Sequence, residues 1–271
     1  HIVLQSDPNC ALAARPNGTH RMLLLTPAQT AALQDWFFPE RVGPLPGPHV
    51  IATGHGRCWV DRWPSPRVVL AEAGGNYSLL GDPGTLAPAD IEPHIKGFVD
   101  APETLAPLLH AAFPDLQVWP RVVFAPLAGE VTLSPSVTGA RRLGTANTAA
   151  LARLDPDSSW ISKTWGGAQG LANSGYAWGA FVDGELAAVA CTFYLGLSYE
   201  DIGVVTIEKY RGRGLSTACT VGLCRDIRAR GHQPIWETSP DNTASLRVAE
   251  KLGFQVDRYD VSYVVGVEIP A

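Results

Sequence analysis

The sequence predicts an α/β protein with a mixed α+β sheet and two lobes, and three observations lead to this fold class. The chain has 271 residues, enough for one large domain or two of ordinary size. Residues 125–139 are rich in Gly, Pro, Ser and Thr, which is typical of a domain linker. After this linker, strand and helix patterns follow in the order β-α-α-β-β-β-α-β-α-β. We therefore expect an N-terminal α+β lobe over residues 1–130 and a second lobe over residues 131–271.

The composition restricts the partners and the compartment. Charged residues make up 17% of the chain and hydrophobic residues 46%, the balance of a globular protein. A net charge of −5 argues against the clustered basic face that a nucleic acid requires. The sequence contains neither an apolar run long enough to cross a membrane nor a signal-peptide pattern. We expect a cytoplasmic protein that binds neither nucleic acid nor membrane.

The cysteines indicate core thiols and no metal site. Cys219 and Cys224 lie on one expected helix, at a spacing that fits neither a zinc site nor a redox pair. The other three, Cys10, Cys58 and Cys191, are scattered along the chain. We expect all five to be reduced, and none to act as a nucleophile.

The N-terminal lobe shows secondary-structure signals but no chemistry. Thr26, Pro27 and Gln29 read as a capping box that opens a helix over residues 27–38. Proline-rich residues 39–56 read as a loop, with His49 and His55 as solvated loop residues. The remaining expected elements are strands at 57–63, 67–73, 76–81 and 118–124, with a hairpin turn at residues 74–76, and a helix at 104–113.

The second lobe shows clearer signals for turns and helix ends. Asp183-Gly184 predicts a two-residue hairpin turn, Gly231 a left-handed helix end, and Asn242 and Gly253 the two ends of a helix. The expected strands are a short one from 141, then 177–182, 186–195, 199–207, 234–238 and 259–267, and the expected helices are 145–154, 215–230 and 242–251, with 160–172 helical or irregular.

A glycine-rich turn over residues 211–217 joins a strand to a helix and is the strongest chemical signal. Exposed backbone N–H groups at a helix N-terminus favour a phosphate group, and two arginines add positive charge. A P-loop would need a lysine after Gly214, and none follows it. A dinucleotide fingerprint would need a third glycine where Thr217 stands, and an earlier place in its lobe. Both signatures fail.

The turn resembles the Gln/Arg-x-x-Gly-x-Gly/Ala pyrophosphate loop of the GNAT acyltransferases. The sequence Arg211-Gly-Arg-Gly-Leu-Ser216 carries this resemblance, and Asn242 with Lys251-Leu-Gly-Phe254 resembles the later motif of that superfamily. The resemblance covers residues 141–267 and implies a GNAT fold for the second lobe. Residues 236–251 resemble the group that contains the zwittermicin A resistance acetyltransferase. Members of that group often carry an extra N-terminal lobe, which would correspond to residues 1–130. One interpretation of this lobe is a degenerate GNAT-like copy of the second.

The resemblance implies that acetyl-CoA is the co-substrate. The main chain of Val205, Thr206 and Ile207 would bind the pantetheine arm at a strand edge, as an added strand would. Asn242 and Ser245 would also bind the cofactor, and Ser245 would lie near its sulfur. The turn residues that would bind the pyrophosphate are Arg211, Gly212, Arg213, Gly214, Leu215, Ser216 and Thr217.

The catalytic groups are less defined. Many family members carry a tyrosine seven residues after the asparagine, taken to protonate the leaving thiolate, and this position is Ala249 here. Ser245 is the substitute hydroxyl, with a bond back into the helix as the alternative. Glu200 matches the strand position of the family's general base, and Glu237 on the neighbouring strand is the second candidate. A solvated or ion-paired carboxylate is the alternative for both, and Asp201 should point to the opposite face from Glu200.

We therefore expect an N-acetyltransferase that acts on a small amine, by direct attack in a ternary complex without a covalent enzyme intermediate. Transfer of another acyl group, including an aminoacyl group, stays open. A non-catalytic acyl-CoA sensor is the third possibility. We expect a monomer or a homodimer.

Overall fold

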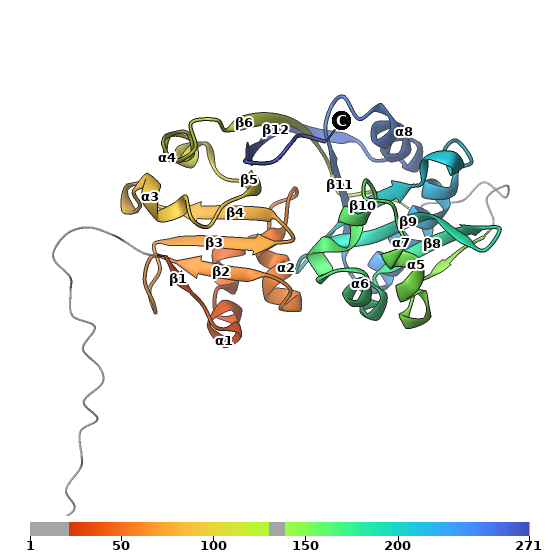
Figure 1. Cartoon of the computed structure of the whole chain (residues 1–271), viewed down its shortest axis with the longest axis horizontal. Helices are drawn as coiled ribbons and strands as arrows, with labels where there is room; N and C mark the ends of the chain where they lie inside the picture. The colour runs from red at the N-terminus through yellow and green to blue at the C-terminus, as the bar shows by residue number, and fades with distance from the viewer. Residues whose placement is uncertain (1–21, 130–138, 271) are drawn as a thin grey trace, which may run out of the picture.

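The computed structural model describes residues 22–129 and 139–270. They form two lobes that share one twelve-stranded sheet, ordered β1-β2-β3-β4-β5-β12-β6-β11-β10-β9-β8-β7. Figure 1 shows the lobes side by side, with the β6–β12 ribbon bridging them.

The strands of the first lobe are β1 (Leu23–Leu24), β2 (Arg57–Val60), β3 (Val68–Ala73), β4 (Asn76–Gly81), β5 (Gly97–Asp100) and β6 (Gln117–Phe124). Those that follow the linker are β7 (Ala140–Arg142), β8 (Ala177–Val182), β9 (Glu185–Leu195), β10 (Tyr199–Thr206), β11 (Gln233–Thr238) and β12 (Val256–Val265).

The α-helices are α1 (Pro27–Ala31), α2 (Pro46–Thr53), α3 (Pro88–Ile91), α4 (Ala106–Ala112), α5 (Thr148–Ala152), α6 (Ala168–Ser174), α7 (Leu215–Ala229) and α8 (Thr243–Leu252). Short 3-10 helices are η1 (Gln34–Phe37), η2 (Pro83–Thr85), η3 (Glu103–Leu105), η4 (Thr145–Asn147), η5 (Ser159–Trp165) and η6 (Glu208–Tyr210).

The element order repeats once along the chain. Each lobe runs through one strand, two helices, three strands, a helix, a strand, a helix and a last strand. Each lobe also has one parallel pair that brackets a helix, β4 with β5 and β10 with β11. The N-terminal lobe is therefore a reduced copy of the same topology, and its helix α3 has 4 residues where α7 has 15.

The two lobes exchange their last strands. β6 pairs antiparallel with both β11 and β12, and β12 also pairs with β5. A strand that precedes residue 130 thus completes the sheet of the second lobe. The predicted boundary near residue 130 adjoins residues 130–138, which lie outside the described residues, and the hydrogen-bonded sheet contains strands from both sides of it.

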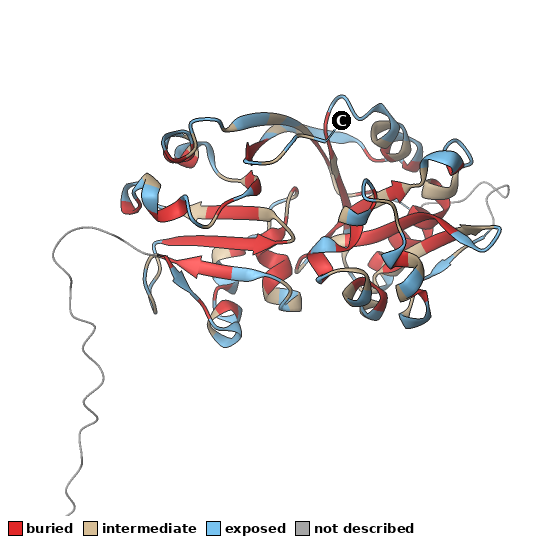
Figure 2. Ribbon diagram, viewed as in Figure 1, coloured by how far each residue is buried: buried red, intermediate tan, exposed pale blue. Residues whose placement is uncertain are grey.

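The sheet is covered on both faces. We call the side under α3, α4, α7 and α8 the α7 face, and the side under α1, α2, η5 and α6 the α2 face. On the α7 face, Ile227, Trp236, Phe124 and Phe254 pack into one buried cluster. On the α2 face, α2 from the first lobe packs against Tyr194 and Ile235 of the second. Figure 2 shows the resulting buried strands, and the more exposed β6–β12 ribbon between the lobes.

Most strand predictions are confirmed, and the β3–β4 and β8–β9 hairpins form where the turn glycines predict them. Thr26 caps α1 with Gln29 as a capping box, but the helix ends at Ala31 and η1 replaces its second half. Three short elements, β1, α3 and β5, were not predicted from the sequence. Among the described residues, no helix is long and apolar enough to cross a membrane.

The predicted loop over residues 39–56 is wrong in its second half. Pro46 and Pro48 open α2, because the first turn of a helix does not need the N–H groups that proline lacks. His49 is fully buried and not solvated as predicted. Its Nδ1 accepts a hydrogen bond from Leu195 N–H (2.9 Å), and its Nε2 donates to the carbonyl of Thr164 (2.9 Å). Burial lowers the His49 pKa to about 4, so the neutral ring joins the lobes at neutral pH.

Candidate active site

Strands β10 and β11 separate in the middle of the sheet. They pair in parallel only from Tyr199 to Asp201, opposite residues 233–235, although both strands continue. Asp201 is the last paired residue, and the register of β10 shifts directly after it. No β11 residue in the described chain pairs with residues 202–206. A wedge thus opens between the two strands.

The main-chain groups that face this wedge follow from the β9 pairing. Ile207 N–H donates to the Ala187 carbonyl of β9 (2.9 Å), so Ile207 and, two residues earlier, Val205 direct their main chains toward β9. The main chains of Val204 and Thr206 therefore point toward β11. Of the three residues predicted to bind through their main chain, only Thr206 is so directed. Its carbonyl also accepts a bond from Arg211 Nε (3.4 Å).

The glycine-rich turn lies at the open end of the wedge and leads into α7. Gly212 and Gly214 have positive φ angles of 77° and 75°, a conformation that glycine adopts without a side-chain penalty. The first intrahelical bond runs from Ala218 N–H to Gly214, which leaves the N–H groups of residues 215–217 free of helix partners. Arg211 and Arg213 are exposed beside them. The turn therefore has the donor geometry and the positive charge that favour an anion.

Helix α8 places a hydroxyl on the α7 face. Asn242 caps the helix through its side chain, which accepts from Ser245 N–H (3.0 Å). Ser245 Oγ accepts a hydrogen bond from the indole of Trp236 on β11 (3.0 Å), so its own proton remains available to a third group. Ala249 is fully buried in the core cluster, at the position where the family's tyrosine would stand.

Glu200 is fully buried, and its carboxylate is held on the α7 face. Arg230 binds it through Nε (2.9 Å) and Nη2 (2.6 Å). His232 Nδ1 lies 3.0 Å away, and the Thr192 hydroxyl donates at 2.5 Å. The alternative weighed from the sequence, an ion-paired carboxylate, describes this environment. It disfavours the predicted general-base role, because no lone pair remains directed toward the wedge.

Glu237 points to the α2 face and forms an ion pair with Arg121 of the exchanged strand β6. Arg121 Nε lies 2.5 Å from Glu237 Oε1, and both side chains are mostly buried. The Arg121 guanidinium also stacks 4.1 Å from the Trp119 ring centroid. Glu237, the second predicted general base, therefore lies next to the wedge, but it is ion-paired with an arginine from the other lobe.

Asp201 is the site residue that sequence reasoning set aside. As predicted, it points away from Glu200, onto the α2 face. It is 8% exposed, and its Oδ1 has no hydrogen-bond partner among the described residues. Burial, and secondarily the charge of Glu237, raise its pKa well above the usual carboxyl value, against the opposing effect of Arg121. The sequence did contain a signal for this residue. Because strand side chains alternate, Asp201 had to be the carboxyl group on the other face from Glu200.

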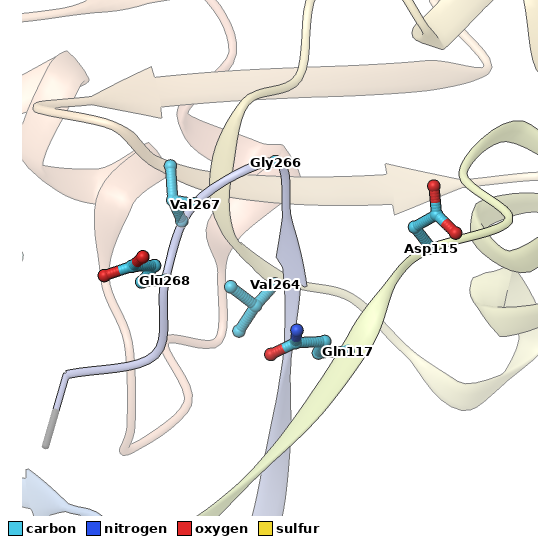
Figure 3. A pocket seen from close by; sticks show the side chains of 6 residues that line it. All are labelled: Asp115, Gln117, Val264, Gly266, Val267 and Glu268. Carbon is cyan, nitrogen blue, oxygen red and sulfur yellow. The ribbon is translucent and has the colours of Figure 1, made fainter.

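A separate hollow of about 330 Å³ lies at the far end of the β6–β12 ribbon (Figure 3). Its carboxylates, Asp115 and Glu268, would repel a phosphate group. None of the predicted site residues lines it. The lining residues are Asp115, Gln117, Val264, Gly266, Val267 and Glu268.

No group of three or more His, Cys, Asp or Glu side chains in the described chain is arranged to hold a metal ion. The four described cysteines are free and buried, and burial raises the pKa of Cys58, Cys219 and Cys224 to about 12. Cys10 lies outside the described residues.

The equivalent turn of the N-terminal lobe has the opposite charge. Asp82 follows β4, and its carboxylate accepts from Gly84 N–H (2.9 Å). Asp90 accepts from Ala87 N–H (2.8 Å) at the start of α3. These carboxylates occupy backbone donors that an anion would need, so this turn does not offer a comparable set of free N–H groups.

Replacing Glu200 with Gln should destabilise the protein, because Arg230 and His232 would lose their buried counter-charge. Breaking a buried ion pair typically costs about 3–5 kcal/mol, and partial rehydration of Arg230 should reduce this to roughly 2–4 kcal/mol. Calorimetry would measure the melting temperature beside Glu92→Gln, an exposed control. A Glu200→Gln protein that melts at the wild-type temperature would contradict the structural role.

Replacing Asp201 with Asn should stabilise the protein in alkaline solution. Because the Asp201 pKa is raised on folding, its ionisation opposes folding as the pH rises above the ordinary carboxyl value. We expect a gain of about 1–3 kcal/mol near pH 8 that disappears as the pH falls toward roughly 4. Thermal unfolding over this pH range would test it, with exposed Asp115→Asn as the control. A less stable Asp201→Asn protein at about pH 8 would exclude the argument.

Known proteins match both the sequence and the fold. The model of the GNAT acetyltransferase family matches residues 141–263. The uncharacterized N-acetyltransferase of the mutA 5' region of Streptomyces virginiae is 41% identical over 216 residues, which cover 78% of this chain and 90% of that protein. A GCN5-related N-acetyltransferase-like protein from Streptococcus suis aligns with a TM-score of 0.65 and 19% identity, over 88% of this chain and 98% of that one.

A tandem GNAT protein from the clavulanic acid biosynthesis pathway aligns over 92% of this chain and 100% of its own, with a TM-score of 0.53 and 15% identity. The two structural matches concern the fold, and they agree with the repeated topology. The sequence match over most of the chain goes further. The chain belongs to the GNAT acetyltransferase family and is an acyltransferase.

Proposed function

We propose that this protein is an acetyl-CoA-dependent N-acetyltransferase that acts on a small amine by direct attack in a ternary complex. The observation that carries this proposal is the wedge between β10 and β11, which opens beside the free N–H groups of α7. An extended amide chain and a pyrophosphate are the two parts of coenzyme A that such an arrangement fits.

The donor would be held by three sets of groups. The N–H groups of residues 215–217 and the side chains of Arg211 and Arg213 would bind the pyrophosphate. Gly212 and Gly214 permit its close approach to the backbone. The main chains of Val204 and Thr206 would bind the pantetheine amides at the unpaired edge of β10.

The attacking nitrogen must lose two protons, one of which balances the thiol that forms on the departing sulfur while the other is released to water. Acetyl-CoA supplies the acetyl thioester, and transfer to a primary ammonium gives an amide, coenzyme A thiol and one proton released to water. A main-chain N–H of β10 near Thr206 would stabilise the oxyanion. Ser245 would donate its hydroxyl proton toward the departing sulfur, because Trp236 already satisfies its oxygen as an acceptor.

The proton acceptor for the amine belongs on the α2 face. Of the two carboxylates named from the sequence, Glu237 faces this side, whereas the Glu200 carboxylate is enclosed by Arg230 and His232. We therefore assign the general-base role to the acidic residues around Glu237. The same Glu200→Gln protein should keep its kcat, measured below its melting temperature.

The sequence of residues 236–251 supports placement beside the zwittermicin A resistance acetyltransferase, and hence a small-molecule amine as the acceptor. We further propose a cytoplasmic monomer or homodimer that uses no metal and binds neither nucleic acid nor membrane. A donor with a different acyl group, or binding without turnover, is an outcome that the following experiment separates.

The full chain should release free thiol from acetyl-CoA only when a panel amine is present, and a thiol reagent would follow this release. Acetyl-CoA should also raise the melting temperature, because a ligand that binds the native state stabilises it. Binding without thiol release would identify a sensor, and preference for another acyl-CoA would identify another transferase. Absence of any binding would exclude the proposal.

Each chain should bind one coenzyme A, because within residues 22–129 and 139–270 only the turn before α7 offers free N–H groups beside arginines. Isothermal titration should therefore give a stoichiometry near one, and Gly214→Val should weaken binding by about tenfold or more, since valine is strained at positive φ. Gly84→Ala in the equivalent N-terminal turn is the matched control and should bind normally. Two sites per chain, or normal binding by Gly214→Val, would refute the assignment.

A further inference from the structure

Acidic side chains gather on the α2 face where the lobes meet. Asp201 lies on β10, Glu237 on β11 and Asp100 on β5, and Arg121 of β6 is the cation that ion-pairs with Glu237. Asp100 is half-buried, and burial with the charges of Glu237 and Asp260 raises its pKa to about 7. We call Asp100, Arg121, Asp201 and Glu237 the seam cluster.

The seam cluster has three carboxyl groups and one guanidinium at its centre. The raised pKa values of Asp100 and Asp201 show that ionisation of all three carboxyl groups is unfavourable without a further cation, so a bound cation would favour the ionised forms. At its edge, Arg41 and Arg258 both bind Asp260, at 2.9 Å and 3.1 Å. Arg258 also pairs with Asp257 (3.1 Å), so the edge adds no net charge. A cation placed among these groups would therefore be stabilised, and an added anion would be repelled.

Polar atoms in this region also lack partners. Three buried side-chain polar atoms in the described residues make no hydrogen bond, and two of them are Asp201 Oδ1 and Trp119 Nε1. Trp119 stacks on Arg121 of the cluster. A buried carboxylate oxygen without a donor costs folding free energy, so it is rare in a native protein unless a bound water or a ligand supplies the donor. Asp201 is only 8% exposed, so bulk solvent does not supply this donor.

The position of Asp201 connects the cluster to the reaction. It lies opposite Ile235 in the last pair before β10 and β11 separate, and opposite Tyr194 on β9. Its side chain points to the α2 face, away from α7 and from the Glu200 ion pair. An ammonium bound to Asp201 would thus lie at the closed end of the wedge that the proposed donor enters from the α7 end.

We propose that Asp201 binds the ammonium group of the acceptor, and that the seam cluster selects acceptors with additional positive charge over those with a carboxylate. This inference rests on the proposed function and adds the class of substrate to it: a small polycationic amine, such as a diamine. Arg121 comes from the exchanged strand β6, so both lobes form this subsite. Asp201 would accept ammonium N–H groups at its free oxygen, while Glu237 stays paired with Arg121.

The test measures acceptor binding apart from turnover. Saturation-transfer NMR on the full chain, saturated with the unreactive analogue desulfo-coenzyme A, would compare 1,3-diaminopropane, propylamine, β-alanine and 1-propanol. We expect the diamine to bind most tightly, β-alanine at least about tenfold more weakly, and propanol not at all. This comparison needs only the wild-type protein. Equal binding of β-alanine and the diamine, or no binding by any amine, would overturn the inference.

Asp201→Asn should weaken diamine binding by at least about tenfold and leave the affinity for desulfo-coenzyme A unchanged. Asp115→Asn, at an exposed aspartate outside the cluster, should bind both ligands normally. Unchanged diamine affinity in Asp201→Asn would refute the role of Asp201. Loss of desulfo-coenzyme A binding by the wild type would instead refute the proposed donor site, so the two failures are distinct.

Discussion

The exchange of β6 and β12 between the lobes is the constraint on which the rest of the structure depends. β6 separates β11 from β12, so the sheet of the second lobe is completed by a strand that precedes the linker. Phe124 of this strand packs with Trp236 and Phe254 on one face, and Arg121 binds Glu237 on the other. The N-terminal lobe is thus a structural part of the site, although it carries no anion-binding turn.

The period of a β-strand divides the site into two chemical environments. Glu200 and Asp201 are neighbours on β10, but their side chains lie on opposite faces of the sheet. Arg230, His232 and Thr192 enclose Glu200, so its charge stabilises the fold. Asp201 faces other carboxyl groups, and no described residue donates a hydrogen bond to its Oδ1. Two adjacent residues of one strand therefore hold carboxyl groups in opposite environments, one fully paired and the other with an unpartnered oxygen.

The two copies of the repeated topology differ at the turn that we propose to bind coenzyme A. In the second lobe, α7 is 15 residues long and its N-terminal N–H groups stay free beside arginines. In the first, the corresponding α3 has 4 residues, and Asp82 and Asp90 occupy nearby N–H groups. A carboxylate bound to these donors fulfils the role that an anionic ligand would have, so this lobe retains the fold without the binding site.

The sequence by itself determined what depends on neighbours along the chain. The Thr26 capping box, the glycine hairpins, the Gly212–Gly214 turn and the Asn242 cap all form as predicted, because each needs only a few adjacent residues. Tertiary structure decided the rest. The burial of His49, the enclosure of Glu200 by Arg230, and the pairing of β6 with β11 join residues from 30 to more than 100 positions apart. Long-range strand pairing and burial leave no local periodic signal, so the acidic seam around Asp201 became visible only in the folded sheet.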